Sequence, residues 1–391
     1  MNGASERMTP LLDWLMSEGR LAPTMGKFVD QVMTRAVAAG LPLWRFYIGI
    51  RVMHPQMATA GILWRRGTGV EEISRAHGVL ETSAYIGSPI QAVRESGKTV
   101  RYRLGDLAGD AHSLLTELLA GGGTDYVAIP MRLSRELSSP VASFATDRPG
   151  GFTDQDLADL ERMVDWMGSV AELHFHRNIA ETVVDTYLGH IVGEQILGGL
   201  IKRGDGREIN AVLWFSDLRD FTGLNERMAA PELIELLNNY LQLVGDALSA
   251  HGGEILKFIG DGVMGYFPAE DALFLPMVTA NALSAARKLI DDVEAANEAR
   301  AAGGADPVRF GVGLHVGPVT FGNVGTESRL DFTVIGPAVN RAARLESLTK
   351  ELKVPVLASA EFKDATIQPL RSMGMHTLRG VPQPVEVFTL P

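Results

Sequence analysis

The segment Glu254–Phe267 constrains the fold more than any other stretch of this 391-residue chain. It reads as an apolar strand, the turn Gly260-Asp261-Gly262 and a second apolar strand. Glycines on both sides of the aspartate supply the backbone freedom that a tight β-hairpin needs. Asp261 at the tip would project out of the sheet, where a cation can reach it. Because an Asp-Gly pair is usually only a turn, the motif needs support from elsewhere in the chain.

A second apolar strand supplies that support. Residues 211–215 read Ala-Val-Leu-Trp-Phe, and Ser216-Asp217 follows directly. We expect this strand to lie beside the hairpin and to bring Asp217 close to Asp261. Two carboxylates on adjacent strand ends form a hard oxygen site suited to Mg²⁺ bound together with phosphate. The alternative role for Asp217 is a helix N-cap, which would need no second carboxylate nearby.

Three motifs in this order resemble the catalytic domain of class III nucleotidyl cyclases. They are Phe-Ser-Asp-Leu-Arg-Asp-Phe-Thr at 215–222, Lys-Phe-Ile-Gly-Asp-Gly at 257–262 and Asp-Phe-Thr-Val-Ile-Gly-Pro-Ala-Val-Asn-Arg-Ala-Ala-Arg at 331–344. The resemblance covers residues 205–391 and implies an α+β, ferredoxin-like (palm-type) cyclase domain. The order that we expect from the pattern, strand, helix, hairpin, helix and strand, matches that fold.

The resemblance implies a metal site and a catalytic pair. Asp217 and Asp261 would bind two ions, Mg²⁺ or Mn²⁺, and the backbone carbonyl of Leu218 would complete the coordination. Asn340 and Arg344 lie four residues apart on one expected helix face. By resemblance, Asn340 orients the ribose and Arg344 stabilises the charge that develops at the α-phosphate.

The resemblance also implies substrate contacts. Lys257 and Thr333 stand at the family's two base-selecting positions, where a donor and an acceptor suit adenine better than guanine. A solvated strand lysine and a β-forming threonine are the alternative interpretations. Free amides in the turn before Phe221 and Thr222 would hold phosphate. Arg379 stands where the family often has a lysine that contacts the terminal phosphates.

The family builds its active sites across a dimer, with the metal aspartates from one chain and the remaining residues from the other. This chain carries both sets, so the resemblance implies a homodimer with two equivalent sites. The predicted reaction converts ATP to 3′,5′-cyclic AMP and pyrophosphate. A guanylate cyclase is one alternative, and a catalytically silent ligand-sensing protein is another.

Residues 1–152 form a separate region with its own pattern. We expect helix to about residue 40, strands at 44–52, 58–64, 126–133 and 141–146, and helices at 89–97 and 111–120. Gly151-Phe-Thr-Asp-Gln-Asp-Leu and the helix after it loosely resemble a GAF-type α/β domain. That resemblance implies a small-molecule ligand and regulation of the catalytic part. A dimerisation domain without a ligand is the alternative.

Residues 153–204 predict a coiled-coil and helical transducer linker. Thr153, with Asp156 three residues later, predicts the start of a helix. Six residues then recur at spacings of three and four: Leu157, Leu160, Val164, Met167, Ala171 and His174. Such a seam either pairs two chains in a coiled coil or packs the helix on its own domain.

Composition limits the remaining function classes. The net charge of −11 disfavours nonspecific binding to nucleic acid or to an anionic membrane. The absence of cysteine excludes disulfides and thiolate metal sites. No apolar run reaches the length of a membrane span and no signal segment is recognisable, so we expect a cytoplasmic protein. His54, His77 and His112 are too scattered to indicate a metal site.

Overall fold

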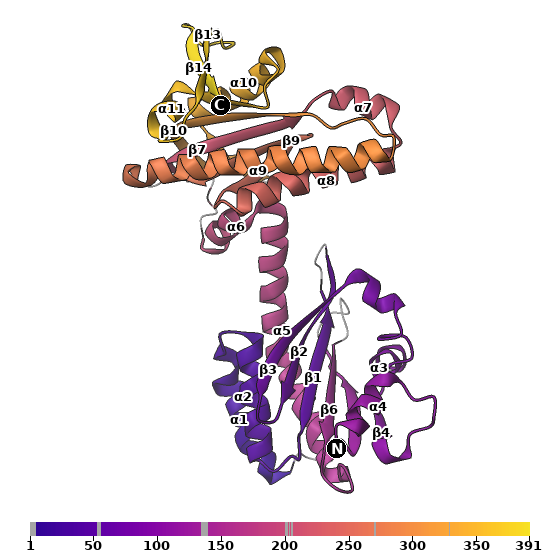
Figure 1. The fold of residues 1–391 in the computed structure, drawn as a ribbon. Helices are drawn as coiled ribbons and strands as arrows, with labels where there is room; N and C mark the ends of the chain where they lie inside the picture. Colours follow the sequence, from indigo (N-terminus) through magenta and orange to yellow (C-terminus); the bar gives the residue numbers. More distant parts are fainter. Residues whose placement is uncertain are drawn as a thin grey trace. The chain divides into compact units, whose positions relative to one another are not determined.

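The computed structural model describes residues 5–52, 56–133, 140–199, 202, 204, 206–269, 271–327 and 329–391. The chain divides into two compact units, Met1–Thr186 and Tyr187–Pro391 (Figure 1), which we call the N-terminal and C-terminal units. Within the described residues, no helix combines the length and the apolar character that crossing a membrane requires. His54 and parts of the expected linker, residues 200, 201, 203 and 205, lie outside the described residues.

One six-stranded sheet forms the centre of the N-terminal unit. Its strands are β1 (Arg45–Arg51), β2 (Met57–Arg65), β3 (Gly69–Ala76), β4 (Val100–Arg103), β5 (Asp125–Pro130) and β6 (Val141–Thr146). They lie in the order β3-β2-β1-β6-β5-β4, and every neighbouring pair is antiparallel. An antiparallel sheet belongs to the α+β class, so the expectation of an α/β domain was wrong. The GAF-type resemblance stays a prediction.

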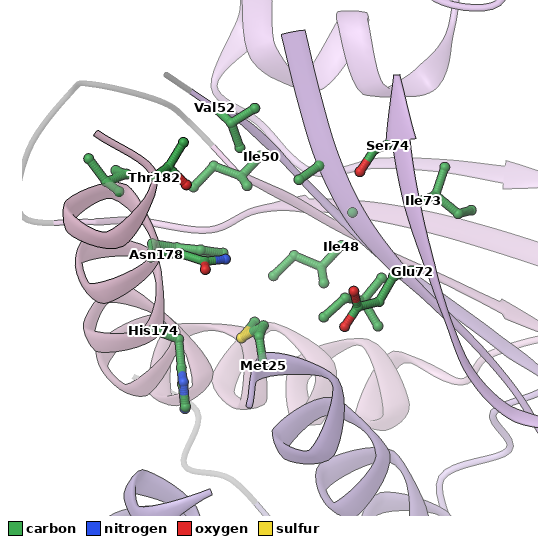
Figure 2. Close-up of a pocket in the computed structure, with 15 residues that line it drawn as sticks. Met25, Ile48, Ile50, Val52, Glu72, Ile73, Ser74, His174, Asn178 and Thr182 are labelled. Atoms are coloured by element: carbon green, nitrogen blue, oxygen red, sulfur yellow. The ribbon is translucent and has the colours of Figure 1, made fainter. Parts of the chain in front are cut away.

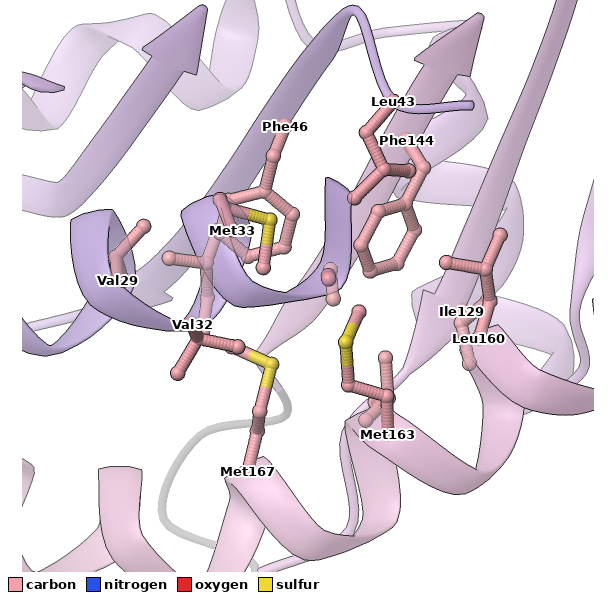
Figure 3. Close-up of a cluster of buried hydrophobic side chains, with 14 of the residues drawn as sticks. Val29, Val32, Met33, Leu43, Phe46, Ile129, Phe144, Leu160, Met163 and Met167 are labelled. Carbon is pink, nitrogen blue, oxygen red and sulfur yellow. The ribbon is translucent and has the colours of Figure 1, made fainter. Parts of the chain in front are cut away.

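Helices cover both faces of this sheet, and its central strands β5 and β6 are buried along nearly their whole length as a result. On one face lie α1 (Thr9–Ser17), α2 (Met25–Ala38) and α5 (Asp154–Leu188), and on the other lie α3 (Pro89–Ser96) and α4 (Ser113–Ala120) (Figure 1). Figure 3 shows the first interface, where Met33 and Met167 of the helices meet Phe46 and Phe144 of the sheet. The rings of Phe46 and Phe144 are 5.0 Å apart, centroid to centroid.

Short 3₁₀ turns complete this unit: η1 (Glu6–Met8), η2 (Gly19–Leu21), η3 (His77–Glu81) and η4 (Leu104–Asp106). The expected strands and helices are all present, with bounds shifted by a few residues. The sequence analysis missed the two edge strands, β3 and β4. β3 is largely exposed, and three of the four residues of β4 are half-buried, so neither strand shows the alternation of buried and exposed residues that marks a half-buried strand.

Helix α5 begins as predicted but packs differently. The Thr153 N–H donates to Asp156 Oδ2 (2.9 Å) and the Asp156 N–H donates to Thr153 Oγ1 (3.2 Å), which is the expected capping box. Four members of the predicted seam are fully buried in the core of their own unit: Leu160, Val164, Met167 and Ala171. A face already buried against α2 and the sheet is not free to pair two chains. The coiled-coil interpretation was therefore wrong for these residues.

The C-terminal unit contains a second, mixed sheet. Its strands are β7 (Gly206–Leu218), β8 (Glu254–Ile259), β9 (Gly262–Pro268), β10 (Phe310–Gly325), β11 (Leu330–Ile335), β12 (Val356–Ser359), β13 (Arg371–His376) and β14 (Val385–Thr389). The order is β13-β14-β12-β10-β7-β9-β8, and β11 pairs with β10. The central part, β10-β7-β9-β8, is antiparallel and has the ferredoxin-like order that the sequence predicts.

Helices cover both faces of the second sheet, and a separate hydrophobic core lies on each face. The helices are α6 (His190–Leu197), α7 (Phe221–Arg227), α8 (Ala230–Ser249), α9 (Leu275–Ala302), α10 (Pro337–Leu352) and α11 (Ala360–Ala365), with a 3₁₀ turn η5 (Ala272–Phe274). α8 and α9 pack together on one face, around Trp214 and Phe267. α10 packs on the other face against β10 and β7. The ends of β7 and of the β8–β9 hairpin project beyond these layers and form the candidate site.

Candidate active site

The two predicted aspartates lie close together. β7 runs antiparallel to β9 with Ser216 opposite Val263, so the end of β7 lies beside the hairpin turn. Gly262 permits this approach, because a Cβ atom there would lie 3.3 Å from Asp217 Oδ1. Asp217 is therefore not an N-cap: the cap of α7 is Asp220, in a left-handed conformation with φ 62°.

The aspartate pair lacks a counter-charge. Burial, followed by the adjacent Asp261 carboxylate, raises the pKa of Asp217 to about 8. Asp217 Oδ1 is buried and has no hydrogen-bond partner within the described residues. Two carboxylates this close can both ionise only when a cation binds them. Carboxylate oxygens are also the ligands that Mg²⁺ and Mn²⁺ prefer, so the residues present fit such an ion.

No third acidic, histidine or cysteine side chain completes this pair into a cluster of three metal ligands in the described part of the chain. Any further ligands of a cation at this pair would then be neutral groups or groups of a substrate. The backbone carbonyl of Leu218, the residue after Asp217, is the neutral ligand that the sequence predicts. Leu218 is itself buried and ends β7.

Buried polar atoms without partners gather around the end of β7. Trp214 Nε1, like Asp217 Oδ1, has no hydrogen-bond partner within the described residues, and the Ser216 and Tyr240 hydroxyls have none beyond each other. Burial raises the pKa of Tyr240, and the carboxylates of Asp217, Glu346 and Asp261 act in the same direction, whereas the Ser216 hydroxyl acts to lower it. Native proteins rarely leave several buried polar groups unsatisfied together, except where a ligand or water is to bind.

The sequence analysis missed Arg219 and Glu346, which lie behind the aspartates. Arg219 donates from Nε to the Phe310 carbonyl (3.0 Å) and from Nη2 to Thr349 Oγ1 (2.9 Å). Burial raises the pKa of Glu346 to about 7, although Arg219 acts to lower it. The sequence feature that could have indicated Glu346 is its position, as an acid, within the mainly apolar buried stripe of α10, next to Leu345.

Lys257 has a different partner from the one expected. A register shift in β8 between Ile255 and Lys257 marks a bulge, a common device for re-aiming a side chain near a site. The Lys257 Nζ lies 2.6 Å from Asp331 Oδ2, on β11. Thr333, the predicted partner, lies two residues further along β11 and is half-buried. The ion pair with Asp331 was not anticipated.

The remaining predicted residues lie at two places. Asn340, which is exposed, and Arg344, which is half-buried, are one turn apart on α10. The Arg344 guanidinium packs on Gly380, where a Cβ atom would lie 3.3 Å from Nη2. The exposed Arg379 directly precedes this glycine in the chain. Phe221 and Thr222 form the first turn of α7, with Phe221 against the core and Thr222 exposed.

The predicted site residues thus form separate groups. Within the residues that the structure describes, no hydrogen bond or ion pair joins Asp217 or Asp261 to Lys257, Asn340 or Arg344. One group presents two carboxylates, and the other presents the cationic side chains of Lys257 and Arg344 and the amide of Asn340.

Residues 207–381 match the family model of the adenylate and guanylate cyclase catalytic domain. The C-terminal unit belongs to this family. Among curated relatives, adenylate cyclase 1 of Rhizobium meliloti is 27% identical over 295 residues, which cover 72% of this chain and 43% of that protein. The adenylate cyclase of Anabaena cylindrica is 29% identical over 276 residues, 65% of this chain and 53% of that protein.

The chain therefore spans about half the length, or less, of these cyclase relatives. Among solved structures, the adenylyl cyclase CyaB from P. aeruginosa is 30% identical, and the match covers 48% of this chain and 96% of that chain with a TM-score of 0.43.

Proposed function

We propose that this protein is an adenylate cyclase that converts ATP to 3′,5′-cyclic AMP and pyrophosphate. The observation that carries the proposal is the pair Asp217 and Asp261, which are adjacent, partly buried and without a counter-charge. The names of the two curated relatives, both adenylate cyclases, support the choice of reaction within the family.

Asp217 and Asp261, with the Leu218 carbonyl, would hold two Mg²⁺ or Mn²⁺ ions. Such ions, when bound, lower the pKa of the ribose 3′-hydroxyl and neutralise charge on the phosphates. The cationic side chain of Arg344 would stabilise the charge that develops at the α-phosphate, and Asn340 would orient the ribose. Amides before Phe221 and Thr222 and the side chain of Arg379 would contact the phosphates; these assignments rest on the family resemblance.

Base selection would rest on Lys257 and Thr333. Adenine presents an acceptor at N1 and a donor at N6, which a lysine and a threonine hydroxyl can satisfy. The carboxylate of Asp331, 2.6 Å from the Lys257 amine, would hold that amine in place. The same carboxylate is an acceptor that could read the N1 donor of guanine, and this favours guanylate cyclase as the second candidate.

Within one chain no hydrogen bond or ion pair among the described residues joins the two groups, which supports a homodimer with shared sites. Coexpression of Asp217→Ala and Arg344→Ala chains tests this. Each variant alone would be inactive, but random pairing gives half mixed dimers with one intact site each, so activity should return to about a quarter of the parent level. If chains shown to mix stay inactive, each site is built within one chain. We propose that the N-terminal unit regulates these sites.

Turnover of ATP and of GTP by the purified full chain tests the reaction. We expect cyclic AMP and pyrophosphate in the presence of Mg²⁺ or Mn²⁺, and none with a chelator. A preference for GTP would establish the guanylate cyclase instead. Absence of product from both nucleotides would favour the catalytically silent sensor.

A further inference from the structure

A cavity of about 250 Å³ lies over one face of the sheet in the N-terminal unit. It is on the face covered by α3 and α4, opposite the core shown in Figure 3. Arg45 and Tyr47 of β1, Arg75 of β3, Tyr126 of β5 and Ser143 of β6 line it. The alternation of the strands directs all five side chains to this face.

Three arginines give the lining of the cavity positive charge. The side chains of Arg45 and Arg75 form no ion pair or hydrogen bond within the part of the chain that the structure describes. Burial lowers the pKa of Arg45. Arg94, whose guanidinium lies 5.7 Å from the centroid of the Tyr85 ring, adds a third cation to the lining. Glu117 is the acid among the described lining residues, and it pairs with none of them through an ion pair.

A buried hydroxyl also faces this cavity. Tyr126 is 0% exposed, and in the described residues its hydroxyl has no partner beyond the hydroxyl of Ser143, which is 1% exposed on β6. The Ser143 hydroxyl donates to the Tyr47 carbonyl (3.5 Å). A buried hydroxyl with so few partners is stabilised when a ligand accepts its hydrogen bond.

Two glycines shape the floor of the cavity. Gly49 and Gly61 lie directly opposite each other on β1 and β2. A Cβ atom at either position would lie 2.6 Å from the Tyr47 hydroxyl oxygen, so the Tyr47 side chain lies flat across both glycines. This arrangement leaves the space above the sheet open, and side chains at the two positions would push Tyr47 into it.

We propose that this cavity binds a small organic anion, a carboxylate or a phosphate ester, whose charged group lies beside Arg45 and Arg75. The Tyr126 hydroxyl donates to that group. The apolar part of the ligand packs on the aliphatic side chains of the walls, among them Leu80 of η3 and Ile90 of α3.

The other large cavity of this unit does not suit an anion. Figure 2 shows it between the sheet and α5, lined by aliphatic side chains such as Ile48 and Ile50. Its titratable lining residues are Glu72, an acid, and His174, whose pKa is lowered by burial. No lysine or arginine is among its described lining residues. The charge therefore distinguishes the two cavities.

Ligand-observed NMR on the full chain tests the proposal with three probes: benzoate, phenyl phosphate and the uncharged benzyl alcohol. We expect one or both anions to bind with a dissociation constant of about 1 mM, given their size, and benzyl alcohol to bind at least about tenfold more weakly. Preference for benzoate identifies a carboxylate ligand, and preference for phenyl phosphate identifies a phosphate ester. Equal binding of all three probes, or no binding of either anion, would overturn the proposal.

Two arginine variants localise the site. Arg45→Gln should lose anion binding at least about tenfold. Arg65→Gln is the matched control, because Arg65 is directly opposite Arg45 on β2 but is exposed and paired with Glu71 (3.3 Å). Since Arg45 forms no ion pair within the described residues, and Glu117 acts on it without direct contact, Arg45→Gln should not lower the melting temperature. A lowered melting temperature, or anion binding equal to that of the parent, would make Arg45 a structural residue and refute the site.

Discussion

The two units differ in whether their buried carboxylates form ion pairs. In the N-terminal unit, Asp125, Asp156 and Asp159 are each at most 1% exposed, and each is paired with an arginine at 2.6–2.8 Å. In the C-terminal unit, Asp217 and Glu346 form no ion pair within the described residues. The acids paired with arginines stabilise the fold, whereas acids without an ion-pair partner indicate a site that binds a cation.

The pKa values express the same difference. Burial alone would raise the pKa of Asp156, but hydrogen bonds from Arg7, Thr153 and Arg148 outweigh it and lower the pKa to about 2. At Asp217 no such donor outweighs burial and the neighbouring carboxylate, and the pKa rises to about 8. Folding is thus favoured by the ionised form of Asp156 and opposed by the ionised form of Asp217.

The largest expected effect is the loss of catalysis when the unpaired acids are changed. Asp261→Ala should lower cyclase turnover by about a thousandfold or more, because metal binding requires the pair. Asp364→Ala, at an exposed aspartate of the same unit, is the matched control and should keep parent turnover. Initial rates at saturating Mg²⁺ decide this. Activity retained in Asp261→Ala would remove the two-metal assignment.

Base selection should respond less strongly. Lys257→Glu places an acceptor against adenine N1 and sets two carboxylates side by side, because Asp331 is already 2.6 Å from the Lys257 amine. We expect ATP turnover to fall by about a hundredfold. Comparing kcat/KM for ATP and GTP measures the change. Unchanged ATP turnover would assign Lys257 to the protein surface.

The paired acids of the N-terminal unit should affect stability instead. Asp156→Ala leaves Arg7 and Arg148 without a shared partner and removes the capping box of α5. We expect the free energy of unfolding to fall by about 3–5 kcal/mol, measured by denaturant unfolding of the full chain. This contribution is present above the ordinary pKa of 3.8 and is lost as the pH falls toward 2. A variant as stable as the parent, with the parent's acid response, would contradict the structural role.

Local patterns in the sequence were sufficient to predict the strands and turns on which the site residues lie. The Gly-Asp-Gly turn, the apolar run before Asp217 and the capping box at Thr153 each depend on residues that are neighbours in the chain. Periodicity also predicted which face of α5 is buried. It could not show what covers that face, because the covering residues of α2 are more than 100 positions away in the chain.

Long-range pairings were beyond such patterns. Lys257 and Asp331 are 74 residues apart, and Arg219 and Thr349 are 130 apart. Their meeting depends on how β11 and α10 pack, which no local spacing encodes. The strand β13 was missed because it is exposed or half-buried throughout and shows no apolar alternation, and β14 was missed although its burial alternates.

Thermal unfolding of the parent and of Asp217→Asn, in EDTA and in Mg²⁺, tests the central claim most directly. In EDTA the variant should melt higher, and its advantage should grow as the pH rises from 3.8 toward about 8, because the folded parent must hold a proton that the unfolded chain has lost. Mg²⁺ should raise the melting temperature of the parent but not that of Asp217→Asn. A variant that melts below the parent in EDTA, or that gains equally from Mg²⁺, would contradict the claim that these unpaired acids form a metal site.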